Sequence, residues 1–187
     1  MSLFARGGDP YLLVIGMTGV KMGDRLVLVG CEHGGRLGAV ASKVGLSGQA
    51  VAVVPDQASA VRAQKGAAGA GVLVDVEVAA PTKLPVADQA FDVAVVDDTG
   101  GLIGGAAATD RPAIVGELGR VLRPGGRAVL IGGTPRGGLS ALLARTPNGP
   151  PFVASDEGRQ ALMSVFKFVR ILAEREGLVF VEGIRPR

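Results

Sequence analysis

The chain has 187 residues, a length that predicts one domain with a single hydrophobic core, extending over residues 1–187. Hydrophobic residues make up 48% and charged residues 20%, so a large core can be buried, and the 30 glycines follow no period, which excludes collagen-like and low-complexity chains. The net charge of +3 comes from scattered arginines without interleaved aromatic residues, which disfavours nucleic acid as a partner.

The chain contains one cysteine, Cys31, and one histidine, His33. An intramolecular disulfide is therefore excluded, and a tetrahedral zinc site would lack ligands, so we expect no metal. A single cysteine fits a reducing compartment, and no apolar segment approaches the ~20 residues of a membrane helix, so we expect a cytoplasmic protein. The apolar run 11–20 leads directly into the first strand, which favours a short helix on the sheet over a signal peptide.

Apolar periodicity predicts strands and helices that alternate along the chain. In order, the pattern predicts a helix over about 10–20, strand 25–29, helix 35–45, strand 50–54, helix 57–67, strands 71–76 and 91–97, helix 110–122, strand 127–132, an irregular stretch 135–158, helix 159–176 and strand 178–184. This alternation is typical of an open, mostly parallel sheet with helices on both faces.

The most informative segment is Leu-Arg-Pro-Gly-Gly at residues 122–126, followed by the apolar run 127–131. The helix before it can be capped by Thr109 or Asp110, and Pro112 lies in its first turn. Pro124 ends this helix, the two glycines form the turn, and the β-branched run predicts a strand buried on both faces.

Three further segments combine a buried strand with a characteristic turn. Residues 23–35 place a glycine-containing turn between an apolar strand and a helix, an arrangement that directs helix N-terminal N–H groups at a ligand. Residues 50–56 form a strand that ends at Pro55-Asp56, and residues 84–97 read Leu-Pro-Val-Ala-Asp-Gln-Ala-Phe-Asp before an apolar strand that ends at Asp97.

These four segments, in this order and spacing, resemble the class I S-adenosylmethionine-dependent methyltransferases over roughly residues 20–133. The resemblance implies a three-layer αβα, Rossmann-like methyltransferase fold with a mostly parallel sheet. The family's sheet ends in an antiparallel hairpin, and because this chain is predicted to lack one of its strands, we expect the C-terminal edge to be truncated. The motifs at residues 84–97 and 122–131 look most like those of the branch that methylates small molecules, including quinone precursors.

The resemblance also implies a cofactor, S-adenosyl-L-methionine, and a set of residues that would bind it: Gly30, Cys31, Glu32, Gly34, Asp56 and Asp97. Three positions depart from the family pattern. Leu28 stands where the family has an acid in its first strand, and Glu32 stands where it has the middle glycine of the first loop. The acid that contacts the adenine should lie near Ala79 or Ala80, and both of these are apolar. The cofactor motifs are therefore degenerate, while the positions that form the scaffold are kept.

Each site residue also has a structural interpretation. Asp56 either binds the ribose hydroxyls or caps the next helix, and its place at a strand's carboxyl end favours the ribose. His33 is a candidate general base or a solvated loop residue.

Asp97 and Asp98 either orient the acceptor or cap the following loop. These two residues and His33 are the candidates for a catalytic residue. Cys31 is expected to pack rather than react, and Asp88 and Asp92 to form turns.

Three functions follow from these observations. The first is methyl transfer to a small-molecule acceptor, in which the protein mainly aligns the reactants, under cover of residues 135–158. The second is a catalytically inactive relative that serves as a binding or assembly subunit, as a homo-oligomer or with a protein partner. The third, a dinucleotide-dependent oxidoreductase, lacks G-x-G-x-x-G at the first turn.

Overall fold

The computed structural model describes residues 9–134 and 151–187. In chain order its elements are α1 (Leu12–Thr18), β1 (Arg25–Val29), α2 (Gly34–Ala41), the 3₁₀ turn η1 (Ser42–Val44), β2 (Gln49–Val54), α3 (Gln57–Gly69), β3 (Asp75–Val78), β4 (Phe91–Asp97), α4 (Arg111–Val121), β5 (Leu122–Gly133), the 3₁₀ turn η2 (Phe152–Ala154), α6 (Asp156–Met163), β6 (Lys167–Arg175) and β7 (Leu178–Ile184).

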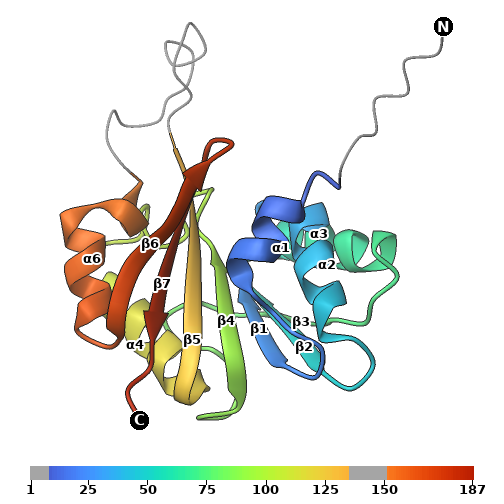
Figure 1. Cartoon of the computed structure of the whole chain (residues 1–187), viewed down its shortest axis with the longest axis horizontal. Coiled ribbons are helices and arrows are strands. Elements are labelled where there is room, and N and C mark those ends of the chain that lie inside the picture. Colours follow the sequence, from blue (N-terminus) through green and yellow to red (C-terminus); the bar gives the residue numbers. More distant parts are fainter. Residues whose placement is uncertain (1–8, 135–150) are drawn as a thin grey trace, which may run out of the picture.

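The strands form one seven-stranded sheet in the order β3-β2-β1-β4-β5-β7-β6 (Figure 1). The pairs from β3 to β5 are parallel, and β7 is antiparallel to both β5 and β6. The sequence order reverses between β1 and β4, because β2 and β3 extend the sheet to one side and β5 extends it to the other. The predicted mostly parallel, Rossmann-like sheet is confirmed.

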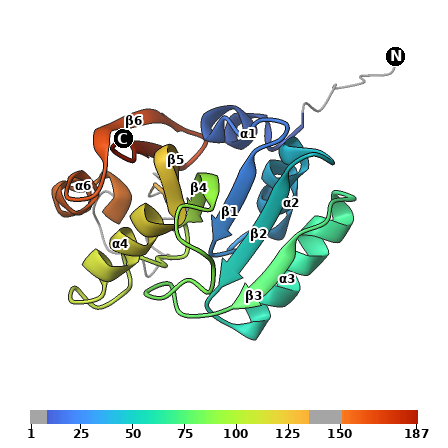
Figure 2. The same ribbon diagram turned by 90° about the horizontal axis from the view of Figure 1, so that it is seen from below.

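Helices cover both faces of this sheet, with α1, α2 and α3 on one side and α4 and α6 on the other (Figure 2). The strands alternate between the two resulting cores. Leu26 and Leu28 of β1 pack with α1, α2 and α3, whereas Val27 and Val29 pack with α4 and α6. Burial on both faces explains why the central strands are continuous apolar runs, as is usual for parallel sheets.

The C-terminal part of the chain corrects two predictions. Residues 159–176 are not one helix, because α6 ends at Met163 and the edge strand β6 begins at Lys167. The expected truncation of the sheet is therefore wrong, since β6 and β7 complete an antiparallel hairpin at this edge.

Two irregularities hide β6 in the sequence. Phe168 has a positive φ of 55°, and the pairing with β7 shifts register at residues 167–170 and again at 171–173. Such bulges interrupt the period-2 alternation by which a strand is recognised. The helix, in turn, begins earlier than predicted because the side chain of Ser155 caps it by accepting from the Gly158 amide at 3.1 Å.

Smaller differences concern the element boundaries. The third strand lies at Asp75–Val78 rather than at 71–76. The strand predicted at 127–132 begins at Leu122, so the segment 122–126, predicted as helix end and turn, is the first part of β5 and pairs with β4 at Phe91. The stretch 135–158, predicted to be irregular, contains η2 and the start of α6, while its residues 135–150 lie outside the described residues. Within the described parts of the chain, no helix is long and apolar enough to cross a membrane.

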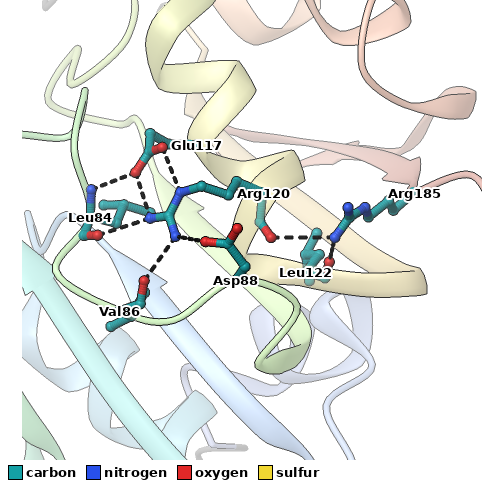
Figure 3. Close-up of polar contacts among 7 residues, drawn as sticks. All are labelled: Leu84, Val86, Asp88, Glu117, Arg120, Leu122 and Arg185. Atoms are coloured by element: carbon teal, nitrogen blue, oxygen red, sulfur yellow. Dashed lines mark hydrogen bonds and ion pairs between the residues drawn. The ribbon is translucent and has the colours of Figure 1, made fainter.

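The loop before β4 is held to the end of α4 by Arg120 (Figure 3). Its guanidinium donates two hydrogen bonds of 2.7 Å to Glu117, one of 2.5 Å to Asp88, and one of 2.9 Å each to the carbonyls of Leu84 and Val86. Glu117 also accepts from the Leu84 amide at 2.7 Å. Because Glu117 and Asp88 stabilise the cation, the pKa of Arg120 is raised above its usual value.

Asp92 binds the Arg25 amide at 2.7 Å and pairs with Arg123. The turn predicted at Asp88 is confirmed, whereas the turn predicted at Asp92 is wrong, because Asp92 is the second residue of β4. Both side chains make structural contacts at the end of β4 opposite to Asp97.

Candidate functional site

The reversal of strand order between β1 and β4 marks the candidate site. Ligands of open parallel sheets bind outside the carboxyl ends of the strands at such a point. The turn after β1 begins at Gly30, whose φ of 80° favours glycine. A Cβ here would lie 3.0 Å from the carbonyl oxygen of Asp97 and 3.0 Å from Cδ2 of Leu102, so the turn after β1 closely approaches the loop after β4.

Asp97 ends β4 and bonds to the turn after β1. Its Oδ2 accepts from the Glu32 amide at 3.2 Å, and its Oδ1 accepts from Nη1 of Arg36 at 2.9 Å and from the hydroxyl of Thr99 at 2.5 Å. Arg36 also donates to that hydroxyl at 3.1 Å. The structure therefore brings together the predicted Glu32 and Asp97, with Arg36 and Thr99, which the sequence analysis missed.

The side chain of Glu32 crosses toward the same loop. A Cβ on Gly100 would lie 2.6 Å from Oε2 of Glu32, so the carboxylate lies against the Gly100 backbone. Glu32 is exposed to solvent, and so is the neighbouring His33. A negatively charged group thus stands at the surface beside the turn after β1.

Gly34 has a different setting from Gly30. It is the first residue of α2, and a Cβ there would clash with the carbonyl of Arg62 in α3. The missing side chain is accounted for by the contact between α2 and α3, and the predicted contact of Gly34 with the cofactor stays a prediction.

Asp56 is the N-cap of α3. Its carboxylate accepts from the Ser59 amide at 2.7 Å, and this hydrogen bond, with that to the Ser59 hydroxyl, lowers the pKa of Asp56. The capping role is therefore present, and the side chain is exposed at the carboxyl end of β2. A carboxylate has further lone pairs, so capping leaves acceptor capacity for ligand hydroxyls.

Cys31 is 4% exposed, and burial raises the pKa of its thiol to about 11. Its carbonyl accepts from Nε of Arg62 at 3.0 Å. Since a thiolate is the reactive form, Cys31 is inert near neutral pH, as expected for a packing residue.

His33 caps α2, because its Nδ1 accepts from the Arg36 amide at 3.4 Å. The ring centroid lies 5.7 Å from that of Tyr11, just before α1. His33 therefore has structural contacts with α2 and Tyr11, and the residue is exposed to solvent.

The resemblance implies acids at position 28 and near Ala79 or Ala80, and of these Leu28 and Ala79 pack against apolar residues. Leu28 is 4% exposed and packs with α1, α2 and α3, and Ala79 packs against the opposite core. The acidic residues at the carboxyl ends of β1, β2 and β4 are Glu32, Asp56, Asp97 and Asp98.

Asp98 is 5% exposed and holds the loop after β4. Its Oδ1 accepts from the amides of Ile103 at 2.5 Å and Gly104 at 3.2 Å. Burial is the main reason that the pKa of Asp98 is raised, with Asp97 adding to it and the two amides opposing it. The loop-capping alternative is thus what the contacts of Asp97 and Asp98 show.

The raised pKa of Asp98 predicts a pH dependence of stability. Between the usual carboxyl pKa and the raised one, the folded state binds more protons than the unfolded state, so the free energy of unfolding falls as the pH rises through this window. Asp98→Asn keeps an acceptor for the two amides but does not ionise. Urea unfolding from pH 4 to pH 8 should show this decline in the native chain and a weaker one in the variant. Identical profiles would contradict the assignment.

A hollow of about 660 Å³ lies beside this edge rather than at it. It is bordered by Tyr11, by Gly34 and Gly35 of α2, and by Arg62 and Lys65 of α3. The residues predicted to bind a cofactor, apart from Gly34, do not line it.

Comparison with known families gives a match over the central part of the chain. The model of a family described as "Methyltransferase domain" matches residues 27–130, more than half of the chain. The match includes the turn after β1, β2, β4 and most of β5. No curated protein matches the chain.

Solved structures share the fold at low sequence identity. A SAM-dependent methyltransferase from Aquifex aeolicus is 20% identical, with a TM-score of 0.66 over 95% of this chain and 94% of that one. A SAM-dependent O-methyltransferase from Thermotoga maritima is 15% identical, with a TM-score of 0.66 over 94% and 64%.

The [4+2]-cyclase SpnF is 18% identical, with a TM-score of 0.67 over 93% of this chain and 78% of that one. The last similarity illustrates that this fold alone does not determine the reaction.

Proposed function

The chain belongs to the methyltransferase domain family, and from this premise we propose that it binds S-adenosylmethionine at the β1–β4 edge and methylates a small-molecule acceptor. The observation that carries the proposal is the gathering of Glu32, Asp56 and Asp97 at the carboxyl ends of β1, β2 and β4. These ends lie on both sides of the point where the strand order reverses, which is where open parallel sheets bind ligands.

The residues at this edge fit the ligand in their chemistry. S-adenosylmethionine presents ribose hydroxyls and an ammonium group, all of which donate hydrogen bonds, and carboxylates are pure acceptors. Asp56 would accept from the ribose, and Glu32 or Asp97 from the ammonium group. Gly30, Cys31 and Gly34 would contribute backbone beside them, which completes the proposed binding set.

When bound, the sulfonium of the cofactor supplies an electrophilic methyl group. The chain would act mainly by aligning the acceptor, which can contribute most of the rate of such a displacement. Asp97 and Asp98 are both hydrogen-bonded to the loop after β4, and His33 caps α2 through Nδ1. None of the three candidate bases is therefore held for proton transfer alone, which favours alignment without a dedicated base.

The loop after β4 supports a small acceptor. Arg111 donates to the Gly104 carbonyl at 2.7 Å, and its guanidinium lies 5.0 Å from the ring centroid of Phe152. A planar cation stacked on an aromatic ring next to buried Asp98 offers both apolar and polar contacts, as small-molecule sites do.

Titration calorimetry with S-adenosylhomocysteine tests the proposal. We expect saturable, one-to-one binding, and no binding of NAD, which serves as the matched control because it also contains an adenosine group. Failure of S-adenosylhomocysteine to bind at millimolar concentration would contradict the proposed function.

Asp56 provides a residue-level prediction. Asp56→Asn keeps the helix cap, since Asn and Asp cap equally well, but loses one of the two oxygens offered to the ribose. We expect affinity for S-adenosylhomocysteine to fall roughly tenfold with an unchanged unfolding midpoint. Asp56→Ala should lose both affinity and stability. If neither variant changes the affinity and only Asp56→Ala unfolds earlier, Asp56 serves as a cap alone.

One observation favours a second candidate function, a catalytically inactive relative that acts as a binding or assembly subunit. The charged residues at the edge contact one another: Asp97 binds the Glu32 amide and Arg36. A chain that binds neither S-adenosylmethionine nor S-adenosylhomocysteine, yet forms a stable oligomer or complex, would support this alternative.

A further inference from the structure

Arg36 occupies an electrostatically unfavourable position. It lies in the first turn of α2, where the positive end of the helix dipole disfavours cations, and no acidic residue in that turn compensates for it. Its side chain is nevertheless only 15% exposed. A long cation is therefore kept at a helix N-terminus by contacts outside the helix.

Those contacts lie across the point where the strand order reverses. Arg36 belongs to the β1 side, and both of its partners, Asp97 at 2.9 Å and Thr99 at 3.1 Å, belong to the β4 side. The side chain of Asp97 is 10% exposed, so this ion pair is shielded from solvent and is worth more than a surface pair.

Two further contacts join the same two loops. The Glu32 amide donates to Asp97 at 3.2 Å, and the Glu32 carboxylate lies against Gly100. The Asp97 carboxylate thus accepts from the backbone of the turn after β1, where the free N–H groups of such a turn bind anions. The carboxylate of Asp97 therefore makes the kind of contact with this turn that an anionic group of a ligand would make.

We propose that Arg36 is a positioning residue that clamps Asp97 across the β1–β4 edge and thereby sets the affinity of the site for its adenosyl ligand. The inference rests on the proposed function. A ligand that enters between the two loops must separate Asp97 from Arg36, and the free energy of that contact is subtracted from its binding. Releasing the clamp therefore strengthens binding and loosens the two loops in the free protein.

Arg36→Met tests the clamp, because methionine retains much of the apolar stem but has neither charge nor donors. In titrations with S-adenosylhomocysteine we expect about tenfold tighter binding, the size of one charged hydrogen-bond contact. In hydrogen–deuterium exchange of the free protein, residues 30–36 and 97–105 should exchange faster, while β5 and β7 keep their protection.

Arg170→Met is the matched control. Arg170 pairs with Glu182 at 2.9 Å on the edge strand β6, at the far side of β5 and β7 from the site. The control variant should change neither the affinity nor the exchange of the two loops.

The readouts separate the clamp from the function. Where the native chain binds S-adenosylhomocysteine, weaker or equal binding by Arg36→Met would overturn the clamp, and weaker binding would make Arg36 a ligand contact. Unchanged exchange of both loops would overturn the clamp in every case. Faster local exchange, with no binding by either protein, would support the clamp while refuting the proposed ligand.

Discussion

Arg120→Met is expected to lower the free energy of unfolding by about 2–4 kcal/mol. The substitution removes five hydrogen bonds, through which one guanidinium connects Glu117 and Asp88 to two backbone carbonyls (Figure 3). Glu117 would lose the contacts that lower its pKa, and the loop before β4 would lose its attachment to α4. Urea denaturation at neutral pH measures the change.

Asp88→Asn is the control for this prediction. The Asp88 side chain is 70% exposed, so its part of the network is an exposed ion pair, for which a change of less than about 1 kcal/mol is expected. Equal losses in the two variants would mean that the carbonyls and Glu117 contribute little. The same pairing explains the sequence segment 84–92 in physical terms, since Asp88 and the Leu84 backbone are both anchored by α4.

The central strands could be predicted from the sequence because they are buried on both faces. An apolar run such as that at residues 93–96 is compatible with few other environments, and the predicted bounds of its strand, 91–97, match β4. The edge strand β6 gave no such signal. Its residues alternate imperfectly around Phe168, and its apolar spacing also fits a helix, so only the pairing with β7 distinguishes the two.

The candidate site was predictable to the level of strand ends. Parallel topology brings the residues after β1 and β4 to one edge, and Glu32 and Asp97 do meet there. The partners Arg36 and Thr99 were missed, because sequence periodicity does not show what a helix residue contacts. One signal was available: a cation in the first turn of a helix is electrostatically disfavoured, which indicates a partner elsewhere.

The glycines of the first turn show where motif-based reasoning needs structure. Gly30 requires its backbone conformation, whereas Gly34 is required by the packing of α2 on α3. Both satisfy the same sequence pattern. A match to that pattern therefore establishes the scaffold more firmly than it establishes contact with a ligand.

Gly66→Ala is expected to lower the free energy of unfolding by about 2–3 kcal/mol. Gly66 lies in α3 directly opposite Gly34, and a Cβ added there would meet the Gly34 carbonyl closer than any real Cβ contact. Because that neighbour is backbone rather than a flexible side chain, α2 and α3 must move apart. The strain outweighs the gain of up to about 1 kcal/mol that alanine brings to a helix.

Gly69→Ala, in the same helix, isolates this effect. A Cβ at Gly69 has no atom within 4 Å, so the substitution changes only helix propensity and should leave the stability equal or slightly higher. Thermal or urea unfolding of the two variants side by side decides the matter. If Gly66→Ala were as stable as Gly69→Ala, the close contact between the helices would not be present in solution. The glycine at position 34 would then need another explanation, and contact with a bound ligand would be the first to consider.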